Sequence, residues 1–399
     1  MESGINIFSN NIPVNGKRII VRLDLNVPIK NSKIDDDTRI KVVEPFINKL
    51  IKDKAKIILI SHLGRPKGKI IPELSLNPIF EYFQKKLDGK IYFYKEKIDE
   101  KAVDASKALN PGEVLLFENI RFYKEEEDDK ETFAKSLSKL GDIYVNEAFS
   151  CSHRKQASMH KITKFIESYG GPILEKEIKS IDLIIKNKKK PVTCIIGGSK
   201  VSTKINILSS LLEKADNLII VGAMANNFLK FKGINIGLSL VEKGTESIVK
   251  NINILAEKNN CKLIIPLDCN TSSNVDGKPI YKYLKDVSSE DMILDIGKDT
   301  INLINNIIDK SKTVFWNGPA GYYENKNFLT GSLSIAKKIA ENTRSKSLIS
   351  IVGGGDTVAA IKNTGLEKVF THLSTAGGAF LESLEGKELP GIKVLKKNS

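Results

Sequence analysis

The sequence predicts an α/β protein with two open domains, each built on a parallel (doubly wound, Rossmann-like) sheet, joined by a helical hinge. Short runs rich in isoleucine, valine and leucine alternate with helix-like segments, which is the pattern of βαβ units. This alternation runs through the first half of the chain, stops near residues 171–191 and starts again afterwards. The length of 399 residues agrees with more than one domain.

Each domain is expected to contain several strands that end in polar or glycine-rich loops. In the first half, strands are predicted at residues 17–23, 57–60, 114–117 and 143–145, and helices at 39–52 and 129–140. In the second half, strands are predicted at residues 192–196, 218–221, 263–266, 313–316 and 347–352. A helix at 173–185 and a lysine-rich run that ends at Pro191 form the connection, which sets the domain boundaries at 1–172, 173–190 and 191–380.

The chain is basic, with 62 Lys and Arg against 48 Asp and Glu and a formal net charge of +14. Such a charge suits nucleic acid, an anionic membrane or a polyanionic small substrate, and composition does not choose among them. The four cysteines form no CxxC pair, so neither a zinc site nor a redox dithiol is indicated. Neither a signal peptide nor an apolar run of the ~18 residues that span a bilayer is visible, so we expect a cytoplasmic protein.

Charged side chains follow the predicted strands of the first half. Open parallel sheets bind their ligands beyond the carboxyl ends of the strands. These positions carry Asp24, Asn26, His62, Arg65 and Arg121, with Arg39 and Arg154 nearby. Because arginine binds carboxylate and phosphate through paired hydrogen bonds, this half is expected to hold a small, strongly anionic ligand.

Glycine-rich loops follow the predicted strands of the second half. They are GGSK at residues 197–200, GGGDT at 353–357 and TAGGA at 375–379, each before a helical pattern. Glycine lets the backbone approach a phosphate, and a helix N-terminus offers free N–H groups to it. Asp356 is a candidate ligand for Mg²⁺ on nucleotide phosphates. Lys200 and Lys204, four residues apart, are expected on one helix face, within reach of one phosphoryl group.

An anion-binding half and a nucleotide-type half together indicate phosphoryl transfer, in which catalysis is mostly positioning and charge neutralisation. Neither GxxxxGK[ST] nor GxGxxG occurs, which disfavours an ordinary P-loop or dinucleotide site. A carboxylate acceptor is already ionised near neutral pH and requires no general base. That agrees with the lack of an obvious catalytic-base motif.

Over essentially its full length the chain resembles the phosphoglycerate kinases. The resemblance is carried by RLDLNVP at residues 22–28, SHLGRP at 61–66, ENIRF at 118–122, residues 197–204, WNGP at 316–319, residues 353–357 and residues 374–379. It implies a reversible, Mg²⁺-dependent transfer between ATP and 3-phosphoglycerate that gives ADP and 1,3-bisphosphoglycerate. It also implies a monomer whose first domain binds the glycerate, whose second domain binds the nucleotide, and whose C-terminal segment (381–399) returns to the first domain.

The same resemblance implies roles for individual residues. The substrate residues would be Asp24, Leu25, Asn26, Arg39, His62, Leu63, Gly64, Arg65, Arg121 and Arg154. The nucleotide residues would be Lys204, Asn317, Glu324 (at the ribose), Gly354, Gly355, Asp356 (which would organise Mg²⁺ through the nucleotide) and Thr357. The catalytic groups would be Arg39, Lys200, Lys204 and the amides of Gly377 and Gly378.

Ser150, Val221 and Ala376 stand where the family pattern has glycine. A positive φ at Ala376 would cost stability, and Ser150 bears on the placing of Arg154. Two alternatives to an active kinase follow. One is a nucleic-acid or polyanion-binding protein, suggested by the net charge of +14, and the other is a kinase-fold protein that binds both ligands without turnover. Because the arginines are intact, the kinase is favoured, and no nucleic acid or membrane is expected as a partner.

Overall fold

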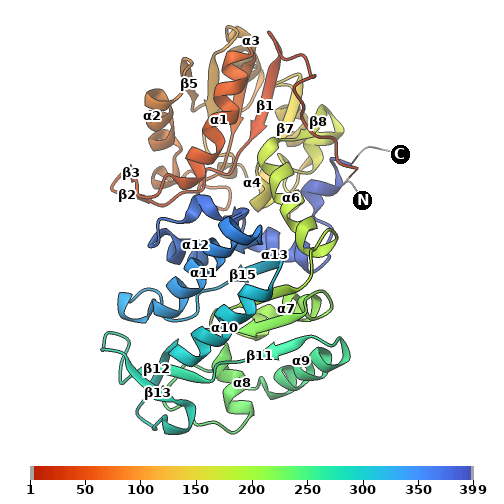
Figure 1. Ribbon diagram of the computed structural model, residues 1–399. Helices are drawn as coiled ribbons and strands as arrows, with labels where there is room; N and C mark the ends of the chain where they lie inside the picture. The colour runs from red at the N-terminus through yellow and green to blue at the C-terminus, as the bar shows by residue number, and fades with distance from the viewer. Residues whose placement is uncertain (1–3, 397–399) are drawn as a thin grey trace. The chain divides into compact units, whose positions relative to one another are not determined.

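The computed structural model describes residues 4–396, and Figure 1 shows their path. The chain divides into two compact units, one made of residues 1–178 and 388–399 and the other of residues 179–387. The division falls inside helix α6 (Pro172–Ile185), which was predicted at 173–185. Each unit contains a six-stranded parallel sheet, so the predicted α/β class with two parallel sheets is confirmed.

The sheet of the first unit has the strand order β5-β6-β4-β1-β7-β8, and all its neighbouring strands are parallel. The strands are β1 (Arg18–Arg22), β4 (Lys56–Ile60), β5 (Ile91–Tyr94), β6 (Val114–Phe117), β7 (Ile143–Asn146) and β8 (Glu167–Gly170). Four of them, β1, β4, β6 and β7, were predicted almost residue for residue. The edge strands β5 and β8 were not predicted, because their short sequences, IYFY and ESYG, lack the fully buried run of a central strand.

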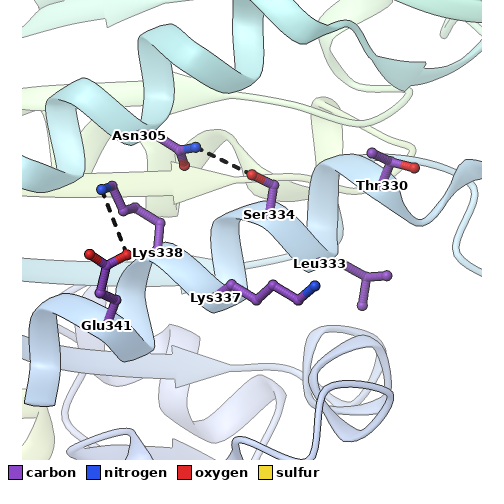
Figure 2. Close-up of a pocket in the computed structure, with 7 residues that line it drawn as sticks. All are labelled: Asn305, Thr330, Leu333, Ser334, Lys337, Lys338 and Glu341. Atoms are coloured by element: carbon purple, nitrogen blue, oxygen red, sulfur yellow. Dashed lines mark hydrogen bonds and ion pairs between the residues drawn. The ribbon is translucent and has the colours of Figure 1, made fainter.

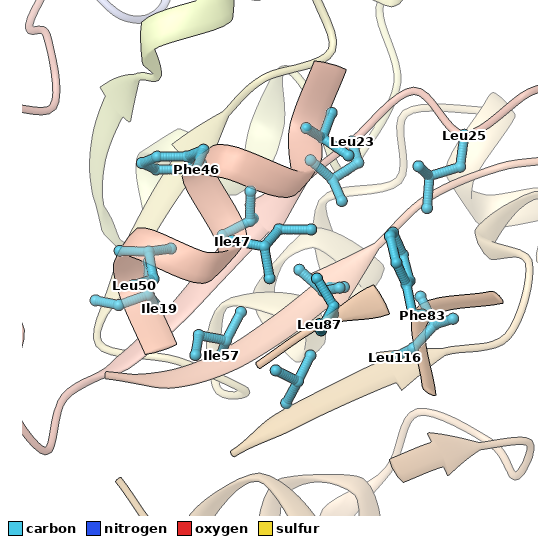
Figure 3. Packing of buried hydrophobic residues seen from close by; sticks show 14 of the residues in the cluster. Ile19, Leu23, Leu25, Phe46, Ile47, Leu50, Ile57, Phe83, Leu87 and Leu116 are labelled. Atoms are coloured by element: carbon cyan, nitrogen blue, oxygen red, sulfur yellow. The ribbon is translucent and has the colours of Figure 1, made fainter. Parts of the chain in front are cut away.

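Helix α1 (Thr38–Lys52), predicted at 39–52, packs against this sheet. Figure 3 shows Phe46, Ile47 and Leu50 of α1 beside Ile19 and Ile57 of the strands, and all five are buried. Full burial of such a side chain stabilises a fold by roughly 1.5–3 kcal/mol. The other helices of this unit are α2 (Asn77–Lys86), α3 (Glu100–Ala108), α4 (Lys124–Glu127) and α5 (Glu131–Ser138).

The C-terminal segment completes the first unit. Its short helix α14 (Pro390–Lys393) packs beside the turn that follows β7, where the Gly391 N–H donates to the Ser152 carbonyl at 2.9 Å. Asn6 N–H donates to the Leu395 carbonyl at 2.8 Å, so the N-terminal segment lies beside it. A short hairpin, β2 (Ile29–Lys30) and β3 (Lys33–Ile34), separates β1 from α1.

The sheet of the second unit has the order β11-β10-β9-β15-β16-β17, again with parallel neighbours. Its strands are β9 (Val192–Ile196), β10 (Asn217–Ile220), β11 (Lys262–Ile264), β15 (Thr313–Asn317), β16 (Ile349–Gly353) and β17 (His372–Ser374). All but β17 were predicted. The chain leaves β9 towards β10 and later returns to β9's other side as β15, which makes the β9–β15 edge the point where the strand order reverses.

A second sheet in this unit, which is antiparallel, was not predicted from the sequence. It pairs β12 (Asp268–Ser272) with β13 (Ile280–Tyr283) and β14 (Met292–Ile296). The β12 sequence, DCNTS, is polar but mostly buried, so its periodicity gave no strand signal.

The helices of the second unit are α7 (Ile205–Leu212), α8 (Ala225–Phe231), α9 (Glu246–Lys258), α10 (Lys298–Lys310), α11 (Thr330–Lys346), α12 (Gly355–Lys362) and α13 (Gly378–Leu384). Helices α10 and α11 run beside each other (Figure 1). Among the described residues, no helix has the length and apolarity that a membrane span requires.

Helix α6 begins on a buried carboxylate. Glu147, just after β7, is 3% exposed, and its Oε2 accepts the N–H groups of Ile173 and Leu174 at 2.9 and 3.1 Å. Burial raises the pKa of Glu147 to about 8, although these two hydrogen bonds favour the ionised form. The N–H groups at the start of α6 are therefore bound by a carboxyl group whose pKa is about 8.

This titration makes stability depend on pH. Since the folded pKa of Glu147 lies above its ordinary value of 4.5, its contribution is greatest at low pH and is lost as pH rises through about 8. Glu147→Gln has no titrating group at this position. We therefore expect the free energy of unfolding of the variant, relative to that of the wild type, to rise by about 1–3 kcal/mol from pH 5 to pH 9. Urea unfolding followed by circular dichroism at both pH values measures it, and an unchanged difference would contradict the burial argument.

Candidate active site

In the first unit, the carboxyl ends of the strands carry a linked set of polar side chains. Arg39, in the first turn of α1, bonds Asp24 beyond β1 through its Nη1 and the carboxylate Oδ2. The Asn26 N–H donates to Asp24 Oδ1 at 3.1 Å, and Asn26 Oδ1 accepts the Gly64 N–H at 2.9 Å. The loops after β1 and β4 are therefore joined, and Leu25 and Leu63 are buried beneath them.

Asp24 is ionised and His62 is neutral in this arrangement. Burial opposes the charge on Asp24, but the Arg39 guanidinium and the hydrogen bonds from Ser150 and Asn26 hold its pKa below the ordinary value. Burial, reinforced by the neighbouring arginines, lowers the pKa of His62 well below 6.5. Arg22 Nη2 lies 3.5 Å from His62 Nδ1. Because a guanidinium only donates, this contact favours the tautomer in which Nδ1 accepts and Nε2 carries the proton.

Two further arginines lie near this set. Arg121, beyond β6, is 3% exposed and donates from Nη1 to the Gly64 carbonyl at 2.8 Å. Burial lowers the pKa of Arg121, and the positive charges of Arg22 and Arg154 act in the same direction. Arg154 donates from Nε to His153 Nε2 at 3.1 Å. Arg65 is exposed on the Gly64 loop.

The turn after β7 adds two residues that were not predicted as site residues. Ser150 Oγ donates to Asp24 Oδ2, and Cys151 Sγ lies 3.8 Å from His62 Nε2 and 3.9 Å from Nδ1. Asp24, His62 and Cys151 are near enough to hold a metal ion. The sulfur, however, is almost equally far from both ring nitrogens, so neither nitrogen lone pair points towards it. The Asp24 carboxylate is also already bonded to Arg39. We interpret this set as part of the anion site.

In the second unit, two strand ends meet at the point where the strand order reverses. A Cβ on Gly197, after β9, would lie 2.3 Å from the Pro319 carbonyl oxygen, and one on Gly318, after β15, would lie 2.4 Å from the Gly197 carbonyl carbon. Only glycine allows the two backbones this approach. Trp316, at the end of β15, is fully buried and donates from Nε1 to the Gly318 carbonyl at 2.8 Å.

Lys204 lies in this junction. Its Nζ donates to the Gly197 carbonyl at 2.7 Å and to Asn317 Oδ1 at 2.8 Å, and burial lowers the pKa of Lys204 to about 8. The prediction that Lys200 and Lys204 share one helix face is wrong, because α7 begins only at Ile205. Lys204 ends a 3-10 turn (Ser202–Lys204), and Lys200 is exposed in the preceding loop, since the glycines delay the start of the helix.

The loop after β16 leads into α12. Thr357 is buried, and its Oγ1 accepts the Gly318 N–H at 2.6 Å. Asn317 donates from Nδ2 to the Gly353 carbonyl at 2.7 Å, so both of its amide groups contact protein. Gly354 has a φ of 95° and Gly355 is exposed. Asp356, in the first turn of α12, is also exposed.

Asp356 has a partner that was not predicted. Tyr323 donates from Oη to Asp356 Oδ1 at 2.9 Å. Burial, reinforced by this hydrogen bond, raises the pKa of Tyr323 to about 12, so the phenol keeps its proton near neutral pH.

The loop after β17 presents open backbone. Gly377 has a φ of 54°, and nothing lies within 4 Å of the Cβ positions of Gly377 and Gly378, so the Cβ side of this backbone faces open space. Ser150, Val221 and Ala376 are not among the residues with positive φ. The strain considered for Ala376 is therefore absent, and Ser150 fits its 3-10 turn (Phe149–Cys151).

A cavity of about 370 Å³ lies among these loops within the second unit. Gly198, Ser199, Tyr323, Glu324 and Asp356 form its polar wall. Its apolar wall includes Leu229 and Leu240 with Met292, Ile293 and Leu294 of β14. Asn226, Asp268 and Asp295 also line the cavity. The polar wall beside the glycine loops and the apolar wall suit a ligand with a phosphate end and a flat apolar part.

The cavity takes in only some of the predicted nucleotide residues. Glu324 and Asp356 line it, whereas Lys204, Asn317 and Thr357 tie its loops together. Lys200, Gly377 and Gly378 do not line it. The apolar wall was missed because it comes largely from the unpredicted antiparallel sheet.

Figure 2 shows a second hollow of about 380 Å³, between α10 and α11. Asn305 donates to Ser334 Oγ at 3.3 Å, and Lys338 pairs with Glu341 at 3.8 Å and Asp309 at 3.0 Å. No predicted site residue lines this hollow. Since Lys338 is engaged by carboxylates, we assign the hollow no ligand.

The phosphoglycerate kinase family model matches residues 9–387. The chain belongs to the phosphoglycerate kinase family. It is 43% identical over 389 residues to the phosphoglycerate kinase of Wolbachia sp. subsp. Drosophila simulans, with 97% of this chain and 98% of the relative covered. It is 44% identical over 391 residues to that of Bartonella bacilliformis, covering 98% of each. The solved phosphoglycerate kinase of Coxiella burnetii matches with a TM-score of 0.88 and 38% identity over 98% of both chains.

As a member of the phosphoglycerate kinase family, the chain is a kinase that transfers phosphate to a carboxyl group. The carboxyl edge of one sheet carries an anion-binding set of arginines, and that of the other carries glycine loops and a cavity. These two half-sites have the complementary chemistry that such a transfer requires.

Proposed function

We propose that the chain catalyses reversible, Mg²⁺-dependent phosphoryl transfer between ATP and the carboxylate of 3-phospho-D-glycerate, giving ADP and 1,3-bisphosphoglycerate in glycolysis. The observation that carries the proposal is the family match over residues 9–387, in a chain that retains the charged residues expected for both ligands. The same proposal divides the chain into an acceptor domain (residues 1–172), a hinge (173–190), a nucleotide domain (191–380) and a segment that returns to the first domain (381–399).

The first unit is proposed to hold the acceptor. Arg65, Arg121 and Arg154 bind the phosphate of the glycerate, for which forked guanidinium groups are suited. Asp24 is ionised and accepts a hydrogen bond from the hydroxyl of the glycerate. His62 is neutral and donates a hydrogen bond to the glycerate from Nε2. The remaining residues of this site are Leu25, Asn26, Leu63 and Gly64, which shape the loops.

Arg39 is proposed to act on the reacting end of the acceptor. In the structure its guanidinium is bonded to Asp24, which holds it at the carboxyl edge of the sheet. A guanidinium oriented in advance stabilises charge on the transferring group without reorganising at the moment of reaction. The glycerate carboxylate is ionised at neutral pH and attacks without a base.

The second unit is proposed to hold the nucleotide. The base occupies the apolar part of the 370 Å³ cavity, and Glu324 contacts the ribose. Gly354, Gly355 and Thr357 place the N-terminus of α12 towards the phosphates, with Asn317 supporting that loop. Lys200, Lys204 and the amides of Gly377 and Gly378 neutralise the phosphoryl group in transfer.

The residues present fit a magnesium ion carried by the nucleotide. Asp356 offers a hard carboxylate oxygen on the polar wall of the cavity, where the residue is exposed. When bound, Mg²⁺ would offset the negative charge of the nucleotide phosphates. Asp356 orients that ion through its carboxylate, and the glycine loops orient the phosphates.

Three further features belong to the proposal. The two units must bring their ligands together during turnover, with α6 as the connecting hinge, because a kinase open to water hydrolyses its nucleotide. The enzyme is a cytoplasmic monomer, as the resemblance implies. Its partners are ATP, ADP and the two phosphoglycerates, with neither nucleic acid nor membrane.

The test is 1,3-bisphosphoglycerate formation from Mg-ATP and 3-phosphoglycerate, coupled to NADH oxidation by a dehydrogenase. We expect oxidation that requires both substrates and Mg²⁺. Binding of both ligands without oxidation would favour the kinase fold that lacks turnover. No glycerate binding, together with RNA binding that weakens steeply with salt, would favour the polyanion-binding alternative.

Replacing the proposed metal ligand should change the Mg²⁺ requirement. In Asp356→Asn, one carboxylate oxygen that binds the ion is lost, so we expect the Mg²⁺ concentration for half-maximal rate to rise at least about tenfold. The control is Asp286→Asn, which removes an exposed carboxylate that does not line the cavity. An Asp356→Asn enzyme with the wild-type Mg²⁺ dependence would remove Asp356 from the metal site.

A further inference from the structure

Tyr323 and Asp356 come from separate loops and meet on the polar wall of the nucleotide cavity. Tyr323 follows β15, Asp356 lies in the first turn of α12, and both line the cavity of about 370 Å³. The Tyr323 hydroxyl donates to Asp356 Oδ1 at 2.9 Å, a normal length for a bond to a carboxylate. The ring of Tyr323 is half-buried, whereas Asp356 is exposed.

This bond matters because Asp356 has little else to orient it. An exposed carboxylate samples several rotamers, so a ligand that requires one of them binds more weakly by the entropy lost in ordering the side chain. The charge of Lys204 acts on Asp356 through space, and the Tyr323 hydroxyl makes a hydrogen bond to its carboxylate. The bond from Tyr323 engages Oδ1 and leaves Oδ2 for a cation. Hydrogen bonds to a carboxylate ligand of this kind fix its direction and commonly change metal affinity by about 10- to 100-fold.

We propose that Tyr323 is a positioning residue that holds the Asp356 carboxylate in the orientation in which its second oxygen meets the cation of the metal–nucleotide complex. The inference rests on the proposed function, in which Asp356 serves the nucleotide-bound metal. Tyr323 itself touches neither the metal nor the phosphates in this account. It acts through Asp356, so its effect exists only when both Asp356 and the divalent cation are present.

The test compares ADP binding by calorimetry with and without Mg²⁺ in wild type and in Tyr323→Phe. The variant keeps the ring and loses only the hydroxyl. We expect about tenfold weaker binding of Mg-ADP and unchanged binding of ADP in EDTA. The matched control is Tyr283→Phe, which removes an exposed hydroxyl of the second unit that does not line the cavity and should bind both forms as the wild type does.

A double-mutant cycle separates positioning from packing. In an Asp356→Asn background, Tyr323→Phe should change Mg-ADP affinity by less than about twofold, because the group it orients is gone. An equal loss with and without Mg²⁺, or a loss that persists in the Asp356→Asn background, would make Tyr323 a direct nucleotide contact and overturn the inference. Thermal melting of each variant confirms that the second unit is folded.

The outcomes also distinguish this inference from the proposed function. If wild-type ADP binding is insensitive to Mg²⁺, the metal role of Asp356 fails, and the Tyr323 inference fails with it. If wild type and Tyr323→Phe show the same Mg²⁺ enhancement, the metal role stands and only the inference is overturned.

Discussion

Replacing Arg39 by alanine is expected to lower kcat by about 100- to 1,000-fold, the loss seen when one preorganised donor to a developing charge is removed. Arg39 is held at the carboxyl edge of the first sheet by its bond to Asp24, so the fold orients its guanidinium. ATP affinity should change less than about threefold, because the proposed nucleotide residues all lie in the second unit. Steady-state kinetics with both substrates varied measures the two effects separately.

A matched control exists in the same unit. Arg18, at the start of β1, makes a comparable pair with Asp142 at 2.6 Å but lies at the opposite end of the strand. Arg18→Ala removes an arginine–aspartate pair of the same unit without touching the proposed site, so its kcat should stay within about twofold of wild type. Similar losses in both variants would mean that Arg39 acts on the fold rather than on the reaction.

Lys204→Met is expected to lower kcat/KM for the nucleotide by about 100-fold or more, since it removes a cation from the transferring group. Burial lowers the pKa of Lys204 to about 8, and only the protonated amine carries charge. The wild-type kcat/KM should therefore be constant below this pKa and fall as pH rises through about 8. The pH profile of kcat/KM, measured from pH 6 to pH 10, tests this directly.

Lys214 is the matched control for this lysine. It too is partly buried in the second unit, where its Nζ donates to the Ser210 carbonyl at 2.9 Å, away from the cavity. Lys214→Met should keep both the rate and the fall above pH 8. If Lys204→Met retained the alkaline fall, another group would be responsible for it, and the role of Lys204 at the phosphoryl group would be contradicted.

The central strands and the site residues at their ends could be predicted from the sequence for one physical reason. A buried parallel strand reads as an unbroken apolar run, so its end is visible, and the residues after it must lie at the carboxyl edge of the sheet. Asp24, after β1, and Asp356, after β16, were predicted as candidates in this way, and the structure places both beyond the ends of these strands. The family resemblance then supplied their roles.

What could not be predicted depends on contacts between distant segments. The bonds of Ser150 to Asp24 and of Tyr323 to Asp356 join residues far apart in the chain, and no local pattern records them. The strand β12, sequence DCNTS, is polar and gave no strand signal, so the sheet that contributes the apolar wall of the cavity was not predicted. Lys200 and Lys204 have helical spacing, but the glycines before them delay α7 to Ile205. Spacing within a segment predicts a shared face only once the helix has begun.

The central claim is that the oxygen atoms of a carboxylate accept the phosphoryl group. It is tested most directly with 3-phosphoglycerate carrying oxygen-18 in both carboxylate positions, incubated with Mg-ATP and the wild-type chain and trapped with hydroxylamine. Hydroxylamine attacks the carbonyl carbon of an acyl phosphate, and the phosphate that leaves retains the bridging oxygen. We expect the hydroxamate of 3-phosphoglycerate together with inorganic phosphate that carries one labelled oxygen. Consumption of ATP with only unlabelled phosphate and no hydroxamate would contradict it.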